Sequence, residues 1–201
     1  PPTLIRTSHP RRTSHPSAAP PAARRTSPPA QAELLVIDEA AAIQLYTQHS
    51  CLYPMLNSAL RDHTHPENLE AFLPYLKLLL KGLNKLPLTR KQVYRGVNVD
   101  LHEEYNQLQG KVFRWWAFSS TTASESTTHF FLGKTGKSTL FKIDGIGVDI
   151  AAFSDFPDES EVLLLPDTCL VLETGVMVKD KCWEFQASVW DAEQQQLQLQ
   201  M

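Results

Sequence analysis

The chain has 201 residues, of which 42% are apolar and 20% charged, as in an ordinary globular domain with tails. Its uninterrupted apolar runs, such as residues 34–37 and 162–165, are far shorter than the roughly 18 residues of a membrane-spanning helix, so we expect no membrane span. The net charge of −3 is unevenly distributed, because residues 1–30 hold five arginines and no acid, which leaves −8 on the remainder. A domain this acidic is not expected to bind nucleic acid as its main task.

Residues 1–32 are predicted to form a disordered tail. Eight prolines, five arginines and a crude Arg-Thr-Ser repeat at residues 6–10, 12–16 and 25–28 give this segment too few apolar residues to form a core. A basic docking or phosphorylation segment is the alternative interpretation. We place one folded domain over residues 33–190 and a Gln-rich tail over residues 191–201.

Apolar residues at helical spacing predict three helices after the tail. The first opens at Ile37–Glu39 and runs through Tyr46, and the second covers Leu52–Leu60. The third and longest runs from Leu69 to Leu80, with Gly82 and Pro87 marking its end. Pro74 lies inside this third run, where a proline is expected to kink a helix.

From Val93 onward the pattern favours short strands. We expect these strands at residues 93–97, 112–116, 139–143, 162–165, 168–172, 176–178 and 183–189, with one helix over residues 123–131. Their spacing and turn residues indicate a β-sandwich. Helices first and strands later predict an α+β fold.

Cysteines and histidines do not predict a disulfide framework or a metal site. Cys51, Cys169 and Cys182 allow one bridge, for example Cys51 to Cys182, or three free thiols, so both a secreted and a cytoplasmic location stay open. His63 and His65 lack a ligand pattern of metal type, so no metal is expected. The glycines and lysines of residues 133–138 do not fit a phosphate-binding loop, because position 131 is Phe131. We expect the protein to be a monomer.

Three polar patches occur in order along the predicted strands: Arg95 in a strand, Ser120 at a strand end, and Glu159 with Glu161 at the start of a strand. Alternation along a strand predicts that the two glutamates point the same way, although their charges would repel at pH 7. Each patch also has a simpler interpretation. Arg95 could extend its charge to solvent, residues 119–122 could cap a helix with Glu125 as partner, and the glutamates could end a solvated loop.

Taken together, the patches resemble a known family. Val93–Gly96, Phe118–Thr122 and Glu159–Glu161 are similar to the Arg, Ser-Thr-Ser and Glu-x-Glu motifs of arginine-specific mono-ADP-ribosyltransferases. Residues 46–47, 56–61 and 147–154 also resemble that family, and the similarity covers roughly residues 38–180. Thr122 departs from the pattern, since the family more often has serine there, but it keeps the hydroxyl.

The resemblance implies a split β-sandwich with NAD bound in a cleft between two sheets. It also implies transfer of ADP-ribose from NAD to an exposed arginine of a protein acceptor, with release of nicotinamide. By this resemblance Glu161 binds the ribose and stabilises an oxocarbenium-like centre, and Glu159 holds and helps deprotonate the incoming guanidinium. Arg95 would pair with the pyrophosphate, and Ser120 would orient Glu161.

The same resemblance suggests further contacts to NAD and to the acceptor. Gly96 would allow the backbone to approach the nicotinamide amide, and Phe130 or Phe131 would stack on the nicotinamide ring, with core packing as the alternative for both phenylalanines. Phe156 would meet the target protein as an exposed aromatic residue. Two other functions remain open: an NAD glycohydrolase on the same scaffold, and a non-catalytic interaction module that binds through its Arg-rich tail.

Overall fold

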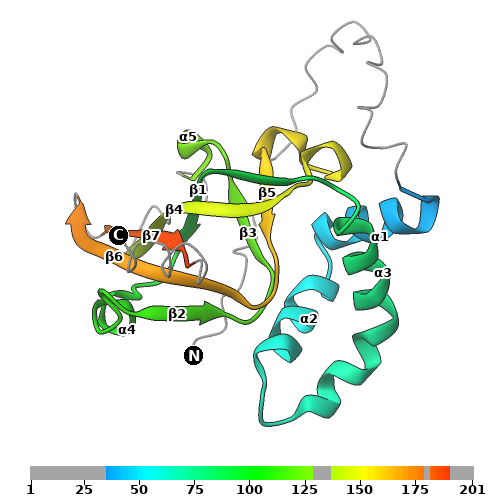
Figure 1. Cartoon of the computed structure of the whole chain (residues 1–201), viewed down its shortest axis with the longest axis horizontal. Helices are drawn as coiled ribbons and strands as arrows, with labels where there is room; N and C mark the ends of the chain where they lie inside the picture. The colour runs from blue at the N-terminus through cyan, green and yellow to red at the C-terminus, as the bar shows by residue number, and fades with distance from the viewer. Residues whose placement is uncertain (1–34, 129–136, 179–181, 191–201) are drawn as a thin grey trace, which may run out of the picture.

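The computed structural model describes residues 35–128, 137–178 and 182–190. The helices before the first strand form one end of the molecule and the strands the other, as Figure 1 shows. The α+β class predicted from the sequence is therefore confirmed. The predicted tails over residues 1–32 and 191–201 lie outside the described residues and stay predictions. No helix in the described ranges is long and apolar enough to cross a membrane.

The helical end consists of α1 (Ile37–Thr47), α2 (Leu52–Arg61), the 3-10 helix η2 (Pro66–Phe72) and α3 (Leu73–Leu83). The first two agree with the predicted helices. The third prediction was wrong, because the expected single kinked helix is two segments that meet at Leu73. Pro74 lies in the first turn of α3, where its missing N–H costs no hydrogen bond and its fixed φ suits the helix start.

The predicted strands are present, several of them longer than expected. The strands are β1 (Leu88–Val97), β2 (Val112–Trp115), β3 (Ser119–Thr122), β4 (Ser138–Asp149), β5 (Glu161–Leu164), β6 (Thr168–Val178) and β7 (Cys182–Val189), of which β3 was not predicted. The segments 168–172 and 176–178, expected as two strands, are one strand with a register shift between Leu172 and Thr174. Residues 119–122 form β3, so their interpretation as only a helix cap was wrong.

Short helical segments connect the strands. They are α4 (His102–Asn106), which the sequence analysis did not predict, α5 (Glu125–Thr128), and the 3-10 turns η3 (Ala151–Phe153) and η4 (Pro157–Glu159). Of the helix expected over residues 123–131, the structure describes α5, and residues 129–131 lie outside the described ranges. Cys51, Cys169 and Cys182 are free thiols, so the bridge considered between Cys51 and Cys182 is not formed.

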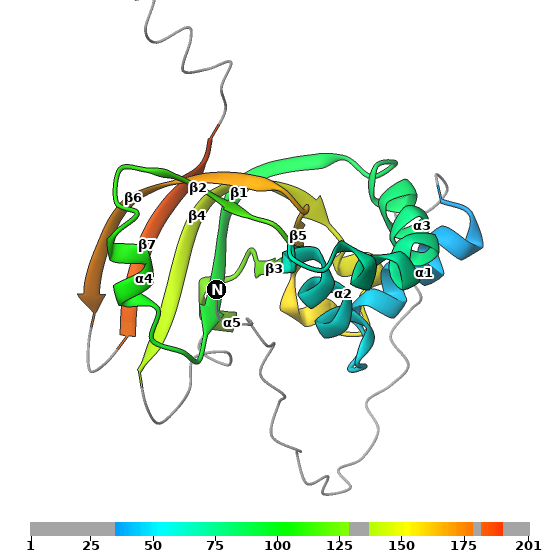
Figure 2. The same cartoon turned by 90° about the horizontal axis from the view of Figure 1, so that it is seen from below.

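The seven strands form one hydrogen-bonded sheet in the order β1-β3-β5-β4-β7-β6-β2, with an additional pairing of β1 and β4. The two halves expected of a split sandwich are joined through β4. Its first residues pair with β7 in parallel, whereas Val148 and Asp149 at its end pair with β5. Consequently β3 and β5 lie between the rest of the sheet and the helices, as Figure 2 shows.

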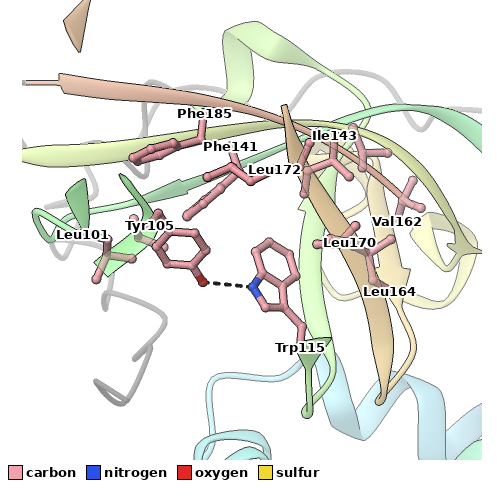
Figure 3. Packing of buried hydrophobic residues seen from close by; sticks show 13 residues of the cluster. Leu101, Tyr105, Trp115, Phe141, Ile143, Val162, Leu164, Leu170, Leu172 and Phe185 are labelled. Atoms are coloured by element: carbon pink, nitrogen blue, oxygen red, sulfur yellow. Dashed lines mark hydrogen bonds between the residues drawn. The ribbon is translucent and has the colours of Figure 1, made fainter. Parts of the chain in front are cut away.

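Two hydrophobic clusters hold β3 and β5 in this position. Inside the sheet, Val162 and Leu164 of β5 pack with Phe141, Leu170 and Phe185, and Figure 3 shows this cluster with the hydrogen bond from Trp115 Nε1 to the Tyr105 hydroxyl. Next to the helices, Leu163 packs in a second cluster that includes residues of α1, α2 and α3 (Ile43, Tyr46, Leu56, Leu79, Leu83, Phe118, Val148 and Ile150). Burying a large apolar side chain stabilises a fold by about 1.5–3 kcal/mol. Both faces of β5 are therefore strongly fixed.

Candidate active site

Arg95 lies at the point where two strands part. β1 pairs with β3 at Tyr94 and Thr122, whereas it pairs with β4 along its whole length. Arg95 Nη1 donates a 2.6 Å hydrogen bond to the backbone carbonyl of Ser120 in β3, and its Cζ lies 5.9 Å from the ring centroid of Trp115. The predicted interpretation that Arg95 extends to solvent is wrong, because the guanidinium is half-buried and held against β3. This contact fixes a permanent positive charge beside the strand.

Ser120, Thr122 and Glu161 share one face of the β3–β5 pair. Ser120 lies opposite Leu163, and Thr122 lies opposite Glu161. Residues that face each other across an antiparallel pair point to the same side, and residues two apart along a strand do so as well. The register therefore places the Ser120 hydroxyl diagonally from the Glu161 carboxyl group. That Ser120 orients Glu161 stays a prediction.

Glu161 is the first residue of β5 and only 1% exposed. Its backbone carbonyl accepts a hydrogen bond from Ile150 N at 3.1 Å, so both the strand pairing and this bond fix its position. The interpretation as a solvated loop end is wrong for this residue. Since burying a carboxylate costs free energy, a fold seldom places one at such a position for stability alone.

Glu159 lies in a different environment from Glu161. It belongs to the 3-10 turn η4 and is half-buried, and Ser160 between the two glutamates has φ 47° and ψ 49° in the left-handed region. The prediction that both glutamates lie on one strand was therefore wrong, since the strand begins only at Glu161, and strand alternation does not decide where the Glu159 side chain points. A left-handed conformation is unfavourable for a residue with a Cβ, so neighbouring contacts must hold this turn.

Those contacts come from the end of β3. Thr122 Oγ1 donates a 2.6 Å hydrogen bond to the carbonyl of Glu159 and accepts one from Ser124 N at 3.0 Å. Ala123 N donates to the carbonyl of Ser160 at 3.1 Å. Thr122 stands where the Ser-Thr-Ser pattern has its second serine. Its hydroxyl connects β3 to the loop that carries Glu159, and a serine hydroxyl could make the same bonds.

Polar residues of α1 and α2 that were not predicted as site residues lie near β3. Asn57 Nδ2 donates to the Tyr46 hydroxyl at 2.9 Å, and the Tyr46 ring lies 5.3 Å from that of Phe118, directly before β3. Within the described ranges Asn57 Oδ1 and Arg61 Nη2 are buried and have no hydrogen-bond partner. Burial lowers the pKa of the Arg61 guanidinium. The sequence signal was the i, i+4 spacing of Asn57 and Arg61 on one helix face.

The other predicted site residues are only partly placed. Gly96 follows Arg95 in β1, opposite Leu140 of β4. Phe156 was expected to be exposed, but it is half-buried and its ring centroid lies 4.6 Å from that of His49. Phe130 and Phe131 lie outside the described residues. Over residues 35–128, 137–178 and 182–190, no group of three or more His, Cys, Asp or Glu residues could hold a metal ion.

Sequence comparison decides the family. The sequence model of the NAD:arginine ADP-ribosyltransferases (ART) matches residues 17–186. The chain belongs to this family. It is 31% identical over 138 residues to an erythroblast NAD(P)(+)–arginine ADP-ribosyltransferase of Gallus gallus, and 37% identical over 138 residues to the NAD(+)–protein-arginine ADP-ribosyltransferase Tre1 of Serratia proteamaculans. The alignments cover 64% and 67% of this chain but 44% and 28% of those proteins, so the chain spans less than half of either family member.

Solved structures of ADP-ribosyltransferases share the fold. HopU1 of Pseudomonas syringae has a TM-score of 0.65 at 25% identity, and the match covers 76% of each chain. The enzyme Vis of Vibrio splendidus, solved in complex with agmatine, has a TM-score of 0.66 at 22% identity, covering 79% of this chain and 76% of Vis. These matches confirm the fold expected from the resemblance.

Proposed function

We propose that the protein transfers ADP-ribose from NAD to an arginine side chain of a protein acceptor and releases nicotinamide. The observation that carries this proposal is the buried Glu161, placed by strand pairing on the same face as Ser120 and Thr122, next to the strand that holds Arg95. Membership in the NAD:arginine ADP-ribosyltransferase family supports NAD as the co-substrate.

NAD binding is assigned to the residues around the parting of β1 and β3. Arg95 supplies a planar cation suited to the pyrophosphate, and Gly96 beside it adds no side chain that would keep the ligand away. Arg61 is a second cation for the same ligand, because its buried Nη2 lacks a hydrogen-bond partner among the described residues. A phosphate oxygen would satisfy that donor. The proposed stacking of Phe130 or Phe131 on nicotinamide rests on the family resemblance.

Glu161 carries the bond-breaking step. When the bond between nicotinamide and ribose breaks, positive charge develops on the sugar, and a fixed carboxylate nearby stabilises it. Since Glu161 is buried in a strand, it needs little reorganisation to do so, and this kind of electrostatic stabilisation is worth on the order of 10²- to 10³-fold in rate. The proposed reaction thus requires no metal, because the carboxylate supplies the stabilising charge.

Glu159 is assigned to the acceptor. It is more accessible than Glu161, and a carboxylate is a good bidentate partner for a guanidinium. Vis was solved with agmatine, which also carries a guanidinium group, and this supports an arginine as the acceptor here. With Phe156 packed on His49, we propose that the edge of this aromatic pair meets the acceptor protein.

The proposal is tested by incubating the chain with labelled NAD and an arginine-rich protein, and measuring both labelled acceptor and free nicotinamide. We expect both products. Nicotinamide release without label on the acceptor would instead support an NAD glycohydrolase. Absence of both products would overturn the proposal, and absence of thermal stabilisation by NAD as well would support a non-catalytic module, since a ligand that binds only the folded state raises stability.

A further inference from the structure

The loop that carries Glu159 is attached to helix α1 far away in the sequence. Resting on the proposed function, we propose that Gln44, Thr47 and His49, here called the α1 clasp, position this loop so that Glu159 receives the acceptor arginine. The α1 clasp would thus decide how much ADP-ribose goes to arginine and how much to water.

Three contacts make up the α1 clasp. Gln44 Nε2 donates a hydrogen bond to Asp155 Oδ1 at 2.9 Å, and Asp155 N donates to Thr47 Oγ1 at 3.2 Å. Thr47 Oγ1 in turn donates to the carbonyl of Gln44 at 2.8 Å, which turns a lone pair of the hydroxyl toward Asp155. The His49 ring packs on that of Phe156. The C-terminal end of α1, with His49 two residues beyond it, therefore contacts the backbone and side chain of Asp155 and the side chain of Phe156.

A second attachment completes the restraint. Thr122 Oγ1 and Ala123 N bind the carbonyls of Glu159 and Ser160, as described above. Only Pro157 and Asp158 separate Phe156 from Glu159, and the proline has a fixed φ. With both ends attached and so short a segment between them, the two sets of contacts restrain the position of Glu159.

The α1 clasp acts on Glu159 and not on Glu161. Glu161 is fixed by its pairing with β3 and by the bond to Ile150 N, neither of which involves α1. Loss of the α1 clasp would release residues 155–158 and leave Glu159 with the attachment to the end of β3, while the buried carboxylate of Glu161 stays in its strand. NAD cleavage by water should then fall much less than transfer to arginine, because a misplaced carboxylate loses orientation of the incoming nucleophile.

The experiment compares Gln44→Ala and Thr47→Val with matched controls. Gln44 is exposed and alanine favours helix, so Gln44→Ala should fold normally. Its control is Gln107→Ala, an exposed glutamine whose amide donates a 3.0 Å hydrogen bond to the carbonyl of Glu103 in α4. Thr47→Val removes the hydroxyl at nearly constant shape, and Thr47→Ser restores it.

We expect the ratio of arginine transfer to NAD hydrolysis to fall about 10-fold in Gln44→Ala and Thr47→Val, with a raised KM for the acceptor and little change in KM for NAD. Thr47→Ser and Gln107→Ala should keep the ratio of the unmodified chain. Equal ratios in all variants would overturn the proposal. A double variant Gln44→Ala with Asp155→Ala should show non-additive losses, since the two side chains contact each other.

Hydrogen exchange separates failure of the α1 clasp from failure of the proposed function. If the unmodified chain neither transfers ADP-ribose nor releases nicotinamide, the proposed function fails. The amide of Asp155 then still reports on the α1 clasp, and it should exchange faster in Thr47→Val than in Thr47→Ser. Equal exchange would show that the α1 clasp does not hold the loop.

Discussion

The two glutamates of the Glu-x-Glu motif lie in two differently built regions. Glu161 belongs to a strand pair, where backbone hydrogen bonds and two hydrophobic clusters fix it. Glu159 belongs to a loop that is held by a few hydrogen bonds and one ring contact, several of them accessible to water. Structures held by few, exposed contacts open at lower free energy than a buried ladder.

This difference suggests a division of labour. Under the proposed function, we expect cleavage of NAD, the step common to transfer and hydrolysis, to depend on the rigid strand. We expect the choice of nucleophile to depend on the loop, where small changes in contacts can move Glu159. The two residues are neighbours in sequence, and the left-handed Ser160 between them separates the two regions.

The largest effect is expected at the strand. Replacing Glu161→Gln keeps the shape of the side chain but removes the charge that stabilises the developing cation. Both arginine transfer and nicotinamide release should fall on the order of 10²- to 10³-fold, as measured with labelled NAD. Nicotinamide release at the unmodified rate would contradict the assignment of Glu161 to NAD cleavage.

Glu159→Gln should separate the two reactions. Transfer to arginine should be lost, because the amide cannot deprotonate the guanidinium, while some NAD hydrolysis should remain. Asp158→Asn, an exposed acid in the same turn, is the matched control and should retain transfer. If Glu159→Gln lowered both reactions equally, the two regions would not have separate tasks.

The strands and their order of motifs could be predicted because their signals are local. A continuous apolar run marks β5 and a short run with valine and tyrosine marks the end of β1, and Arg95, Ser120 and Glu161 occur on strands in the structure. The resemblance that rests on these residues predicted the fold and the family correctly.

The turn at Glu159 could not be predicted because it depends on distant contacts. The carbonyl of Glu159 binds a hydroxyl 37 residues earlier in the chain, and the preceding loop binds α1 more than 100 residues earlier. Nothing in Glu-Ser-Glu itself excludes a strand. Pro74 was misjudged for a related reason, since the same proline kinks a helix interior but suits its first turn.

A structural test of the rigid region is Gly147→Ala in β4. An added Cβ would lie 2.8 Å from Val162 Cγ1 and 2.9 Å from the carbonyl oxygen of Leu163, directly behind the strand of Glu161. Overpacking of this kind costs about 1–3 kcal/mol, and transfer and hydrolysis should decrease together because β5 is displaced.

The matched control for this substitution is Gly145→Ala. At that position the nearest atoms are side-chain methyl groups at 3.2–3.5 Å, which can move more easily than backbone. Urea unfolding of both variants measures the loss. If Gly147→Ala were as stable as Gly145→Ala, the packing behind β5 would yield easily, and the strand of Glu161 would not be more rigid than the loop of Glu159.

The smallest effect on catalysis is expected from Glu39, which holds α1, and thus the α1 clasp, on the helical end. Its buried carboxylate accepts a hydrogen bond from Lys85 Nζ at 2.7 Å and lies 3.4 Å from Lys81 Nζ. The Lys85 bond, against the opposing effect of burial and with help from Val36 N, lowers the pKa of Glu39 below its ordinary value of 4.5. A carboxylate with a lowered pKa in the folded state stabilises the fold above the ordinary pKa.

This stabilisation should disappear as the pH falls below 4.5 and through the lowered pKa of the folded state. Glu39→Gln should therefore unfold at lower urea concentration than the unmodified chain at pH 7, and the difference should shrink at pH 3. Asp38→Asn, which replaces an exposed acid in the same first turn of α1, should show a much smaller difference at pH 7. The hydrogen bonds and ion pairs of Glu39 to described residues involve Val36, Lys81 and Lys85, which belong neither to the sheet nor to the loop of Glu159. The ratio of transfer to hydrolysis should therefore stay unchanged under conditions where Glu39→Gln is folded. A changed ratio would show that the contacts between α1 and α3 also influence the position of the loop that carries Glu159.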